Sequence, residues 1–179
     1  MIAGLGPARL LAVMMMALSV ADCGFRPVYG PGAAGATPAA AVGLSEINVK
    51  LIPERSGQLL RQYLQQRFEG SGGSFTKLYD LAVNFNVAQE GVAISRADSV
   101  ATRIRIVGIA TWSLISMDAE RKTVTSGLAR SVDGFNPLDI QYFYSDLQTE
   151  QAQRRVAEAV ADQISLQLAS YFHVHPPGG

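Results

Sequence analysis

The chain has 179 residues; its 15 Lys and Arg balance its 15 Asp and Glu, and 48% of its residues are hydrophobic. A net charge of zero argues against a general nucleic-acid-binding protein, and this hydrophobic content lies well above that of disordered chains. We therefore expect one folded domain of ordinary size, with no nucleic acid among its partners.

An apolar run lies near the amino terminus. Twelve residues, LLAVMMMALSVA, separate Arg9 from Asp22. A membrane-spanning helix needs about 20 apolar residues, whereas the apolar core of a signal peptide has roughly 7–15. We predict a signal peptide over residues 1–22. The alternative is a helix of the core, which the glycines and proline at its start and the lack of a polar face disfavour.

Cys23, the only cysteine of the chain, follows this run directly. A lone cysteine has no disulfide partner in the chain, and a metal site needs clustered ligands, so its position predicts covalent modification. The stretch resembles the bacterial lipobox, in which the cysteine is acylated and becomes the new amino terminus, although Asp22 stands where Gly, Ala or Ser is usual. We predict that Cys23 is lipidated and that its acyl chains hold the protein to a membrane.

Residues 30–44, GPGAAGATPAAAVGL, are small, uncharged and without periodicity. Such composition predicts a flexible tether, the alternative being a helix through the alanines. We therefore assign residues 23–44 to a lipidated amino terminus and flexible linker, 45–173 to a single domain and 174–179 to a flexible tail.

The domain opens with a predicted strand over 45–51, where Ile47, Val49 and Leu51 alternate with polar residues. Helical spacing of apolar residues predicts a helix over 54–70, which ends at Gly70. Alternation returns in strands over 78–89 and 102–116, and a polar turn at 117–123 leads to a strand over 124–135. Apolar residues every four positions then predict a helix of roughly 25 residues after Ser145, a suitable N-cap.

The element order β-α-β-β-β-α predicts an α+β two-layer sandwich, in which two helices cover one face of a four-stranded, mainly antiparallel sheet. The other face would be mostly polar and uncovered, although Val107 and Ile109 interrupt its polar character. An ordinary solvated face is the alternative interpretation. The residues expected on it are Asn84, Asn86, Arg103, Arg105, Thr111 and Ser113.

Several segments resemble one family. CGFRPVYG, residues 23–30, resembles the CGFRPLYG start of the mature lipopolysaccharide-assembly lipoprotein LptE in its alphaproteobacterial form, from which it departs at Val28. The likeness continues through AISRADSVATRIRI (93–106), TWSL (111–114) and EQAQRRVAEAVADQISLQLASYF (150–172). It covers essentially the whole mature chain, and its first eight residues are its most specific part.

This resemblance implies a non-catalytic lipoprotein that forms a plug and assembly partner of the LptD β-barrel and assists lipopolysaccharide transport to the outer leaflet. It implies an outer-membrane location, facing the periplasm and inside the barrel lumen, with lipopolysaccharide and an LptD-like barrel as partners. Lipid A phosphates would pair with Arg and Lys, although such residues mostly keep a sheet soluble. The candidate ligands are Arg96, Arg103, Arg105, Arg121 and Lys122.

Another class of function fits the same features. A periplasmic lipid-binding lipoprotein, auxiliary to an ABC-type transporter, would need an apolar pocket between its helices and its sheet. An enzyme is disfavoured, because the sequence contains no metal cluster, phosphate loop, nucleophile–base pair or paired acids, and we expect no cofactor. The only histidines, His173 and His175, have no acid near them in the sequence.

Overall fold

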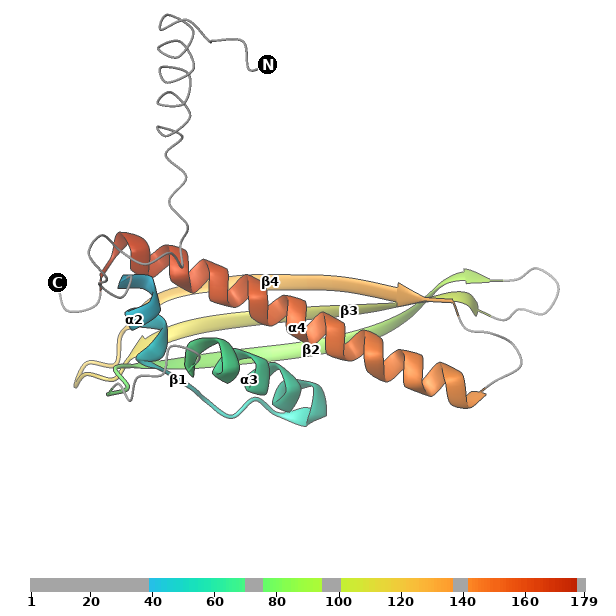
Figure 1. Cartoon of the computed structure of the whole chain (residues 1–179), viewed down its shortest axis with the longest axis horizontal. Coiled ribbons are helices and arrows are strands. Elements are labelled where there is room, and N and C mark those ends of the chain that lie inside the picture. The colour runs from blue at the N-terminus through green and yellow to red at the C-terminus, as the bar shows by residue number, and fades with distance from the viewer. Residues whose placement is uncertain (1–38, 70–75, 95–100, 137–141, 177–179) are drawn as a thin grey trace, which may run out of the picture.

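The computed structural model describes residues 39–69, 76–94, 101–136 and 142–176. Its four strands form one open sheet in the order β1-β2-β3-β4, in which only β1 and β2 are parallel. Helices α3 and α4 lie side by side across one face of this sheet (Figure 1). The predicted two-layer α+β fold is confirmed. The elements are α2 (Ala39–Ser45), β1 (Ile47–Val49), α3 (Glu54–Glu69), β2 (Tyr79–Ile94), β3 (Ala101–Ser116), β4 (Thr123–Phe135) and α4 (Tyr142–Val174).

The helix-covered face holds the core because alternate residues of each strand point toward the helices. β3 contributes Ile106, Ala110, Trp112 and Leu114, all 5% exposed or less. Gly108 shares their parity, and a β-carbon there would collide with Val156 of α4. The absence of a side chain at Gly108 therefore lets α4 approach the sheet closely. The apolar stripe of α4 fills this interface with Val156, Val160, Ile164, Leu168 and Phe172, each 0% exposed.

The flexible linker predicted for residues 23–44 differs from the structure at its end. Residues 39–44 belong to α2, where Ala40 and Leu44 are buried. Gly43 lies against the ring of Phe172 so closely that a β-carbon would collide with it. Packing against α4 thus stabilises a helix that the composition did not predict. Residues 1–38, with the predicted signal peptide and Cys23, lie outside the described residues.

The last helix is longer than predicted. α4 has 33 residues and begins at Tyr142, so Ser145 lies inside it and the prediction of an N-cap there was wrong. An N-cap contributes only about 1 kcal/mol, too little to fix a helix boundary when the preceding residues are themselves helical. At about 1.5 Å per residue, α4 is about 50 Å long.

Polar side chains of α4 bind the backbone of β4. The Arg130 N–H donates to Gln163 Oε1 at 3.0 Å. Gln167 Nε2 donates to the Leu128 carbonyl at 3.1 Å, and its Oε1 accepts a hydrogen bond from Trp112 Nε1 at 2.9 Å. These bonds fix α4 lengthwise along β4.

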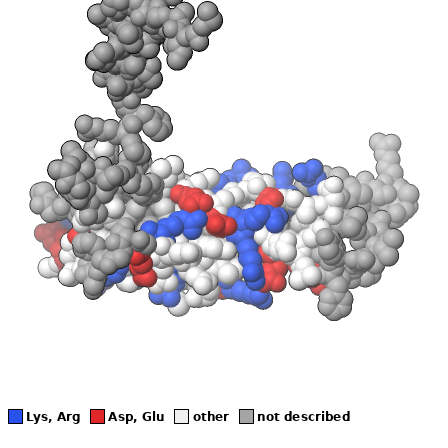
Figure 2. Space-filling view, viewed as in Figure 1, with Lys and Arg blue, Asp and Glu red and all other residues white. Residues whose placement is uncertain are grey.

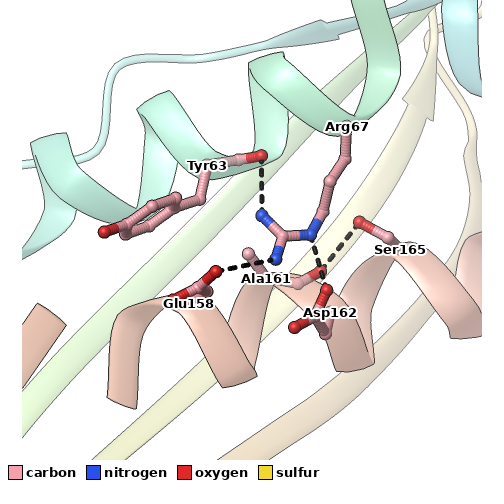
Figure 3. A network of polar contacts seen from close by, with 6 residues as sticks. All are labelled: Tyr63, Arg67, Glu158, Ala161, Asp162 and Ser165. Carbon is pink, nitrogen blue, oxygen red and sulfur yellow. Dashed lines mark hydrogen bonds and ion pairs between the residues drawn. The ribbon is translucent and has the colours of Figure 1, made fainter. Parts of the chain in front are cut away.

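An arginine joins the two long helices (Figure 3). Arg67 of α3 donates from Nε to Asp162 Oδ1 of α4 at 2.6 Å and from Nη1 to the Tyr63 carbonyl at 3.2 Å. Its Nη2 lies 3.9 Å from Glu158 Oε1. The guanidinium group is thus shared between both helices, which fixes their relative position.

Candidate functional site: the open face of the sheet

The face of the sheet opposite the helices is a mixed polar and aliphatic surface. Strand register places Asn86 opposite Ile109 and Ile109 opposite Arg130. In the neighbouring rows Thr111 lies opposite Leu128, and Val107 opposite Val132. Three aliphatic side chains in the middle of this surface are well exposed: Ile109 at 40%, Leu128 at 55% and Val132 at 47%. We call this surface the open face.

The prediction of a polar open face is partly confirmed. Asn84, Asn86, Arg103, Arg105 and Thr111 are exposed, and Ser113 is half-buried. The aliphatic group at its centre is larger than expected, because β4 adds two members to it. The open face is therefore amphipathic rather than simply solvated.

The cations of the open face differ in their pairing. Arg105 donates from Nη2 and Nε to Glu90 Oε2 at 2.7 and 3.1 Å, so its charge is largely balanced. Within residues 39–69, 76–94, 101–136 and 142–176, the guanidinium groups of Arg103 and Arg130 form no hydrogen bond or ion pair. These two groups are therefore free to bind an anion, which a guanidinium does with two parallel hydrogen bonds.

Two shallow pockets open on or beside this face. One, of about 360 Å³, is lined by Arg103, Arg105, Val132, Asp133 and Gly134. The other, of about 370 Å³, is lined mainly by Ala82, Asn84, Thr111 and Ser113. The first combines guanidinium groups with an aliphatic side chain, which suits a ligand that carries both an anionic group and an alkyl chain.

The predicted basic residues fall into two groups at opposite ends of the sheet. Arg103 and Arg105 lie near the start of β3, whereas Arg121 and Lys122 lie in the turn that follows its end. At about 3.3 Å per residue, the strand between them spans roughly 40 Å. Lys122 is paired with Glu120. One small ligand cannot touch both groups. Arg96 and Cys23 lie outside the described residues.

Arg121 and Lys122 lie in a hydrogen-bonded turn between β3 and β4. The backbone N–H groups of Glu120 and Arg121 donate to Asp118 Oδ1 at 3.1 and 2.9 Å, and Arg121 has a φ of 45°. A hydrogen bond with Ser116 and these backbone bonds lower the pKa of the Asp118 carboxyl. The turn therefore keeps an ionised Asp118 at its centre near neutral pH.

Sequence reasoning missed β4 as a part of the site. Leu128, Arg130 and Val132 share one parity and point away from the helices. Alternation in VTSGLARSVDGF could have found them, but both parities of that segment mix polar and apolar residues. The face of β4 becomes clear only from its register with β3.

The helix-covered side carries a different charge pattern. Figure 2 shows acidic and basic side chains mixed over α3 and α4, without a large area of one sign. In the described segments, no three His, Cys, Asp or Glu side chains lie close enough together to hold a metal ion. No helix of those segments is long and apolar enough to cross a membrane.

Comparison with known proteins gives a consistent group of structural relatives. No protein-family model matches the chain, and no curated protein matches it in sequence. A candidate lipoprotein from Caulobacter crescentus CB15 matches with a TM-score of 0.61 and 25% identity over 78% of this chain and 98% of that one.

Two further solved structures are similar at lower identity. Rare lipoprotein B from Shewanella oneidensis matches with a TM-score of 0.52 and 8% identity over 72% of this chain and 96% of that one. A minor lipoprotein from Acinetobacter baumannii matches with a TM-score of 0.50 and 14% identity over 70% and 90%. The chain therefore has the fold that these lipoproteins share.

Proposed function

We propose that this protein is a non-catalytic outer-membrane lipoprotein of the LptE type, which forms a plug and assembly partner of an LptD-like β-barrel and assists lipopolysaccharide transport. The observation that carries the proposal is the contrast between the faces of the sheet: one is filled by helices, and the other is open, amphipathic and bears two guanidinium groups that have no partner among the described residues. The CGFRPVYG start and the similarity to lipoproteins support the same conclusion.

The filled core supports this function over that of a lipid carrier. An auxiliary lipid-binding protein would hold its ligand between helices and sheet. In this chain that space is occupied by side chains with under 2% exposure from both layers, among them Leu81, Ile106 and Leu114 of the sheet and Ile164, Leu168 and Phe172 of α4. A pocket of about 410 Å³ does lie among the three helices, lined by Leu44, Arg67, Asp162, Ser165 and Leu166, but it is outside the layer between helices and sheet. On the sheet itself, the surface left for recognition is the open face.

The chemistry of the open face suits the interior of a wide barrel. The lumen of an outer-membrane barrel is polar, and Asn84, Asn86 and Thr111 offer hydrogen-bonding groups toward it. Leu128 and Val132 would pack against the aliphatic parts of the barrel wall. We infer that this face meets the partner, while α3 and α4 keep the sheet rigid.

The free guanidinium groups suit the phosphates of lipopolysaccharide. Arg103 lines the pocket of about 360 Å³ together with Val132, so a phosphate and an acyl chain could be contacted at one place. Arg130 lies on the same face, midway along the edge strand β4 and opposite Ile109. Arg121 and Lys122 lie at the other end of the sheet and do not belong to this site.

The first test is the identity of the partner. A tagged full-length chain is recovered from membranes in mild detergent, and its partners are identified by mass spectrometry. We expect a stoichiometric large β-barrel. Recovery alone, or with an inner-membrane transporter, would contradict the proposal and favour a lipid-carrying auxiliary protein.

A matched pair of variants locates the interface. Leu128 on the open face and Leu166 on α4 are 55% and 53% exposed. Leu128→Asp should reduce recovery of the barrel at least tenfold, because a charge would be buried at the interface, whereas Leu166→Asp should leave recovery unchanged. Equal recovery with both variants would show that the open face is not the contact.

A second pair tests the ligand. Arg103→Gln combined with Arg130→Gln should weaken binding of purified lipopolysaccharide, measured by titration with the isolated protein. Arg154→Gln on α4 is the control, because Arg154 is paired with Glu150 away from the open face. Equal affinity of both variants and the unmodified chain would remove the two arginines from the proposal.

A further inference from the structure

We propose that the end of the domain built around α2 rests on the bilayer surface, with Leu78, Met117 and Val174 inserted at the boundary between headgroups and acyl chains. We call this region the α2 end. The inference rests on the proposed lipidation of Cys23. It adds a second membrane contact, made by the folded domain itself, and thereby an orientation.

Four segments distant in the sequence meet at the α2 end (Figure 1). The Met117 N–H, after β3, donates to the Leu78 carbonyl, before β2, at 2.9 Å. The Leu78 N–H in turn donates to the Glu46 carbonyl, just after α2, at 2.9 Å. The last turn of α4 joins them through Phe172, whose ring centroid lies 5.4 Å from that of Tyr79.

In the part of this end that the structure describes, three apolar side chains are well exposed. Leu78 and Met117, neighbours through their backbones, are each 44% exposed, and Val174 is 70% exposed. Basic residues Lys77, Arg121 and Lys122 flank them. Apolar side chains bordered by Lys and Arg are typical of membrane-surface contacts, because long basic side chains reach headgroup phosphates while their stems lie in the apolar layer.

The charges of the α2 end allow such a contact. Glu120 is paired with Lys122, and the Asp118 carboxylate accepts the backbone N–H groups of its own turn. Lys77 donates to the Ser45 carbonyl at 2.8 Å. In the described part of this end, the guanidinium group of Arg121 is uncommitted. A headgroup phosphate would be its counter-ion.

The length of chain between Cys23 and α2 selects this end. Fifteen residues, 24–38, precede Ala39. A flexible coil of this length has an r.m.s. end-to-end distance of about 20 Å, whereas α4 alone is about 50 Å long. An acylated Cys23 therefore holds the α2 end nearest the bilayer and directs the opposite end, with Arg103 and Arg105, away from it.

The test measures depth in a membrane with a fluorescent label. The mature lipidated protein is reconstituted in vesicles of phosphatidylethanolamine and phosphatidylglycerol, with a label at Met117→Cys or, as control, at Leu128→Cys on the open face. Because Cys23 is acylated, the new cysteine is the only free thiol. We expect lipids that carry a quencher near the headgroup to quench the label at 117 at least threefold more than the label at 128.

The outcomes separate this inference from the proposal on which it rests. Mass spectrometry of the same preparation reports whether Cys23 carries acyl chains. Equal quenching at both positions in an acylated protein would overturn only the contact of the α2 end. A chain without acyl groups would contradict the lipoprotein assignment and, with it, this inference. Adding Leu78→Asp to Met117→Cys should abolish the difference from 128, and persistence of the difference would also contradict the contact.

Discussion

Two isoleucines of the same strand show how differently the two faces of the sheet are used. Ile106 points toward the helices and is 0% exposed, whereas Ile109, three residues along β3, lies on the open face and is 40% exposed. Strand alternation alone separates them. Burial on one side gives the domain its stability, and exposure on the other leaves the surface for which we propose a binding role.

The charges of the two layers differ in the same way. On the helix layer, Arg67 and Arg154 are paired with acids of α4. On the open face, Arg103 and Arg130 have no partner among the described residues. The arginines that join the helices are thus satisfied within the domain, whereas those of the open face are available for the binding role proposed above.

The largest predicted effect comes from the two isoleucines. Ile106→Ala should lower the free energy of unfolding by about 2–5 kcal/mol, because it leaves a cavity under α4. Ile109→Ala should change it by about 0.5 kcal/mol or less, as for other surface positions. Urea denaturation followed by circular dichroism measures both. Similar losses would show that the open face is packed as tightly as the core.

A smaller effect is expected where Gln167 satisfies the indole of Trp112. Gln167→Met should cost about 1–3 kcal/mol, because the buried Trp112 N–H loses its acceptor. In a Trp112→Phe background the same substitution should cost clearly less. Thermal unfolding of the unmodified protein, the two single variants and the double variant gives the coupling free energy between Gln167 and Trp112. Additive costs would mean that the bond contributes nothing to the packing of α4 on the sheet.

The ion pair between the helices should contribute less again. Asp162→Asn should lower the free energy of unfolding by about 0.2–1 kcal/mol, since Asp162 is largely exposed and Arg67 keeps its bond to the Tyr63 carbonyl. The difference should shrink in concentrated salt. Glu69→Gln, at the end of α3, is a control without this pair. A salt-independent loss would indicate that packing, and not charge, is affected.

The smallest effect tests whether the carboxyl group of Glu46, just after α2, is shielded from water. Burial raises the pKa of Glu46 above its ordinary value of 4.5, and its Oε2 has no hydrogen-bond partner among the described residues. A carboxyl whose pKa is raised in the folded state lowers the free energy of unfolding as pH rises from its unfolded-state pKa to its folded-state pKa. Below both pKa values this cost is absent. Glu46→Gln should therefore raise the melting temperature relative to the unmodified protein at pH 7 and lose that advantage near pH 4. A constant difference from pH 4 to pH 7 would mean that this carboxyl is well hydrated.

The sequence predicted the long strands and the last helix better than the short helix α2 at one end of the domain. Alternation in residues 78–89 and 102–116 and the four-residue spacing of α4 were sufficient for the fold, because a single periodicity governs each segment. A helix through the alanines of residues 30–44 was only the alternative to a tether, because nothing in the sequence shows the fit of Gly43 against Phe172 that stabilises α2. Long-range packing of this kind leaves no local pattern.

The candidate site was predicted in part for a similar reason. Arg103 and Arg105 follow from the parity of one strand, and the structure places both on the open face. Arg130 and Leu128 depend on the register between β3 and β4, which sequence alternation does not fix when both parities are mixed. The separation of Arg121 and Lys122 from the other arginines follows from the length of β3.

The glutamines of α4 have a consequence for how copies of this protein behave beside one another. β4 is the last strand of an open sheet, and the unpaired N–H and C=O groups of such a strand can template a strand from another molecule. Gln163 and Gln167 occupy the Arg130 N–H and the Leu128 C=O on that rim. The side chains that hold α4 in register thus also occupy two backbone groups that a strand of a neighbouring chain would need at this edge. Pairing of β4 with another copy would therefore first have to displace α4 from the sheet.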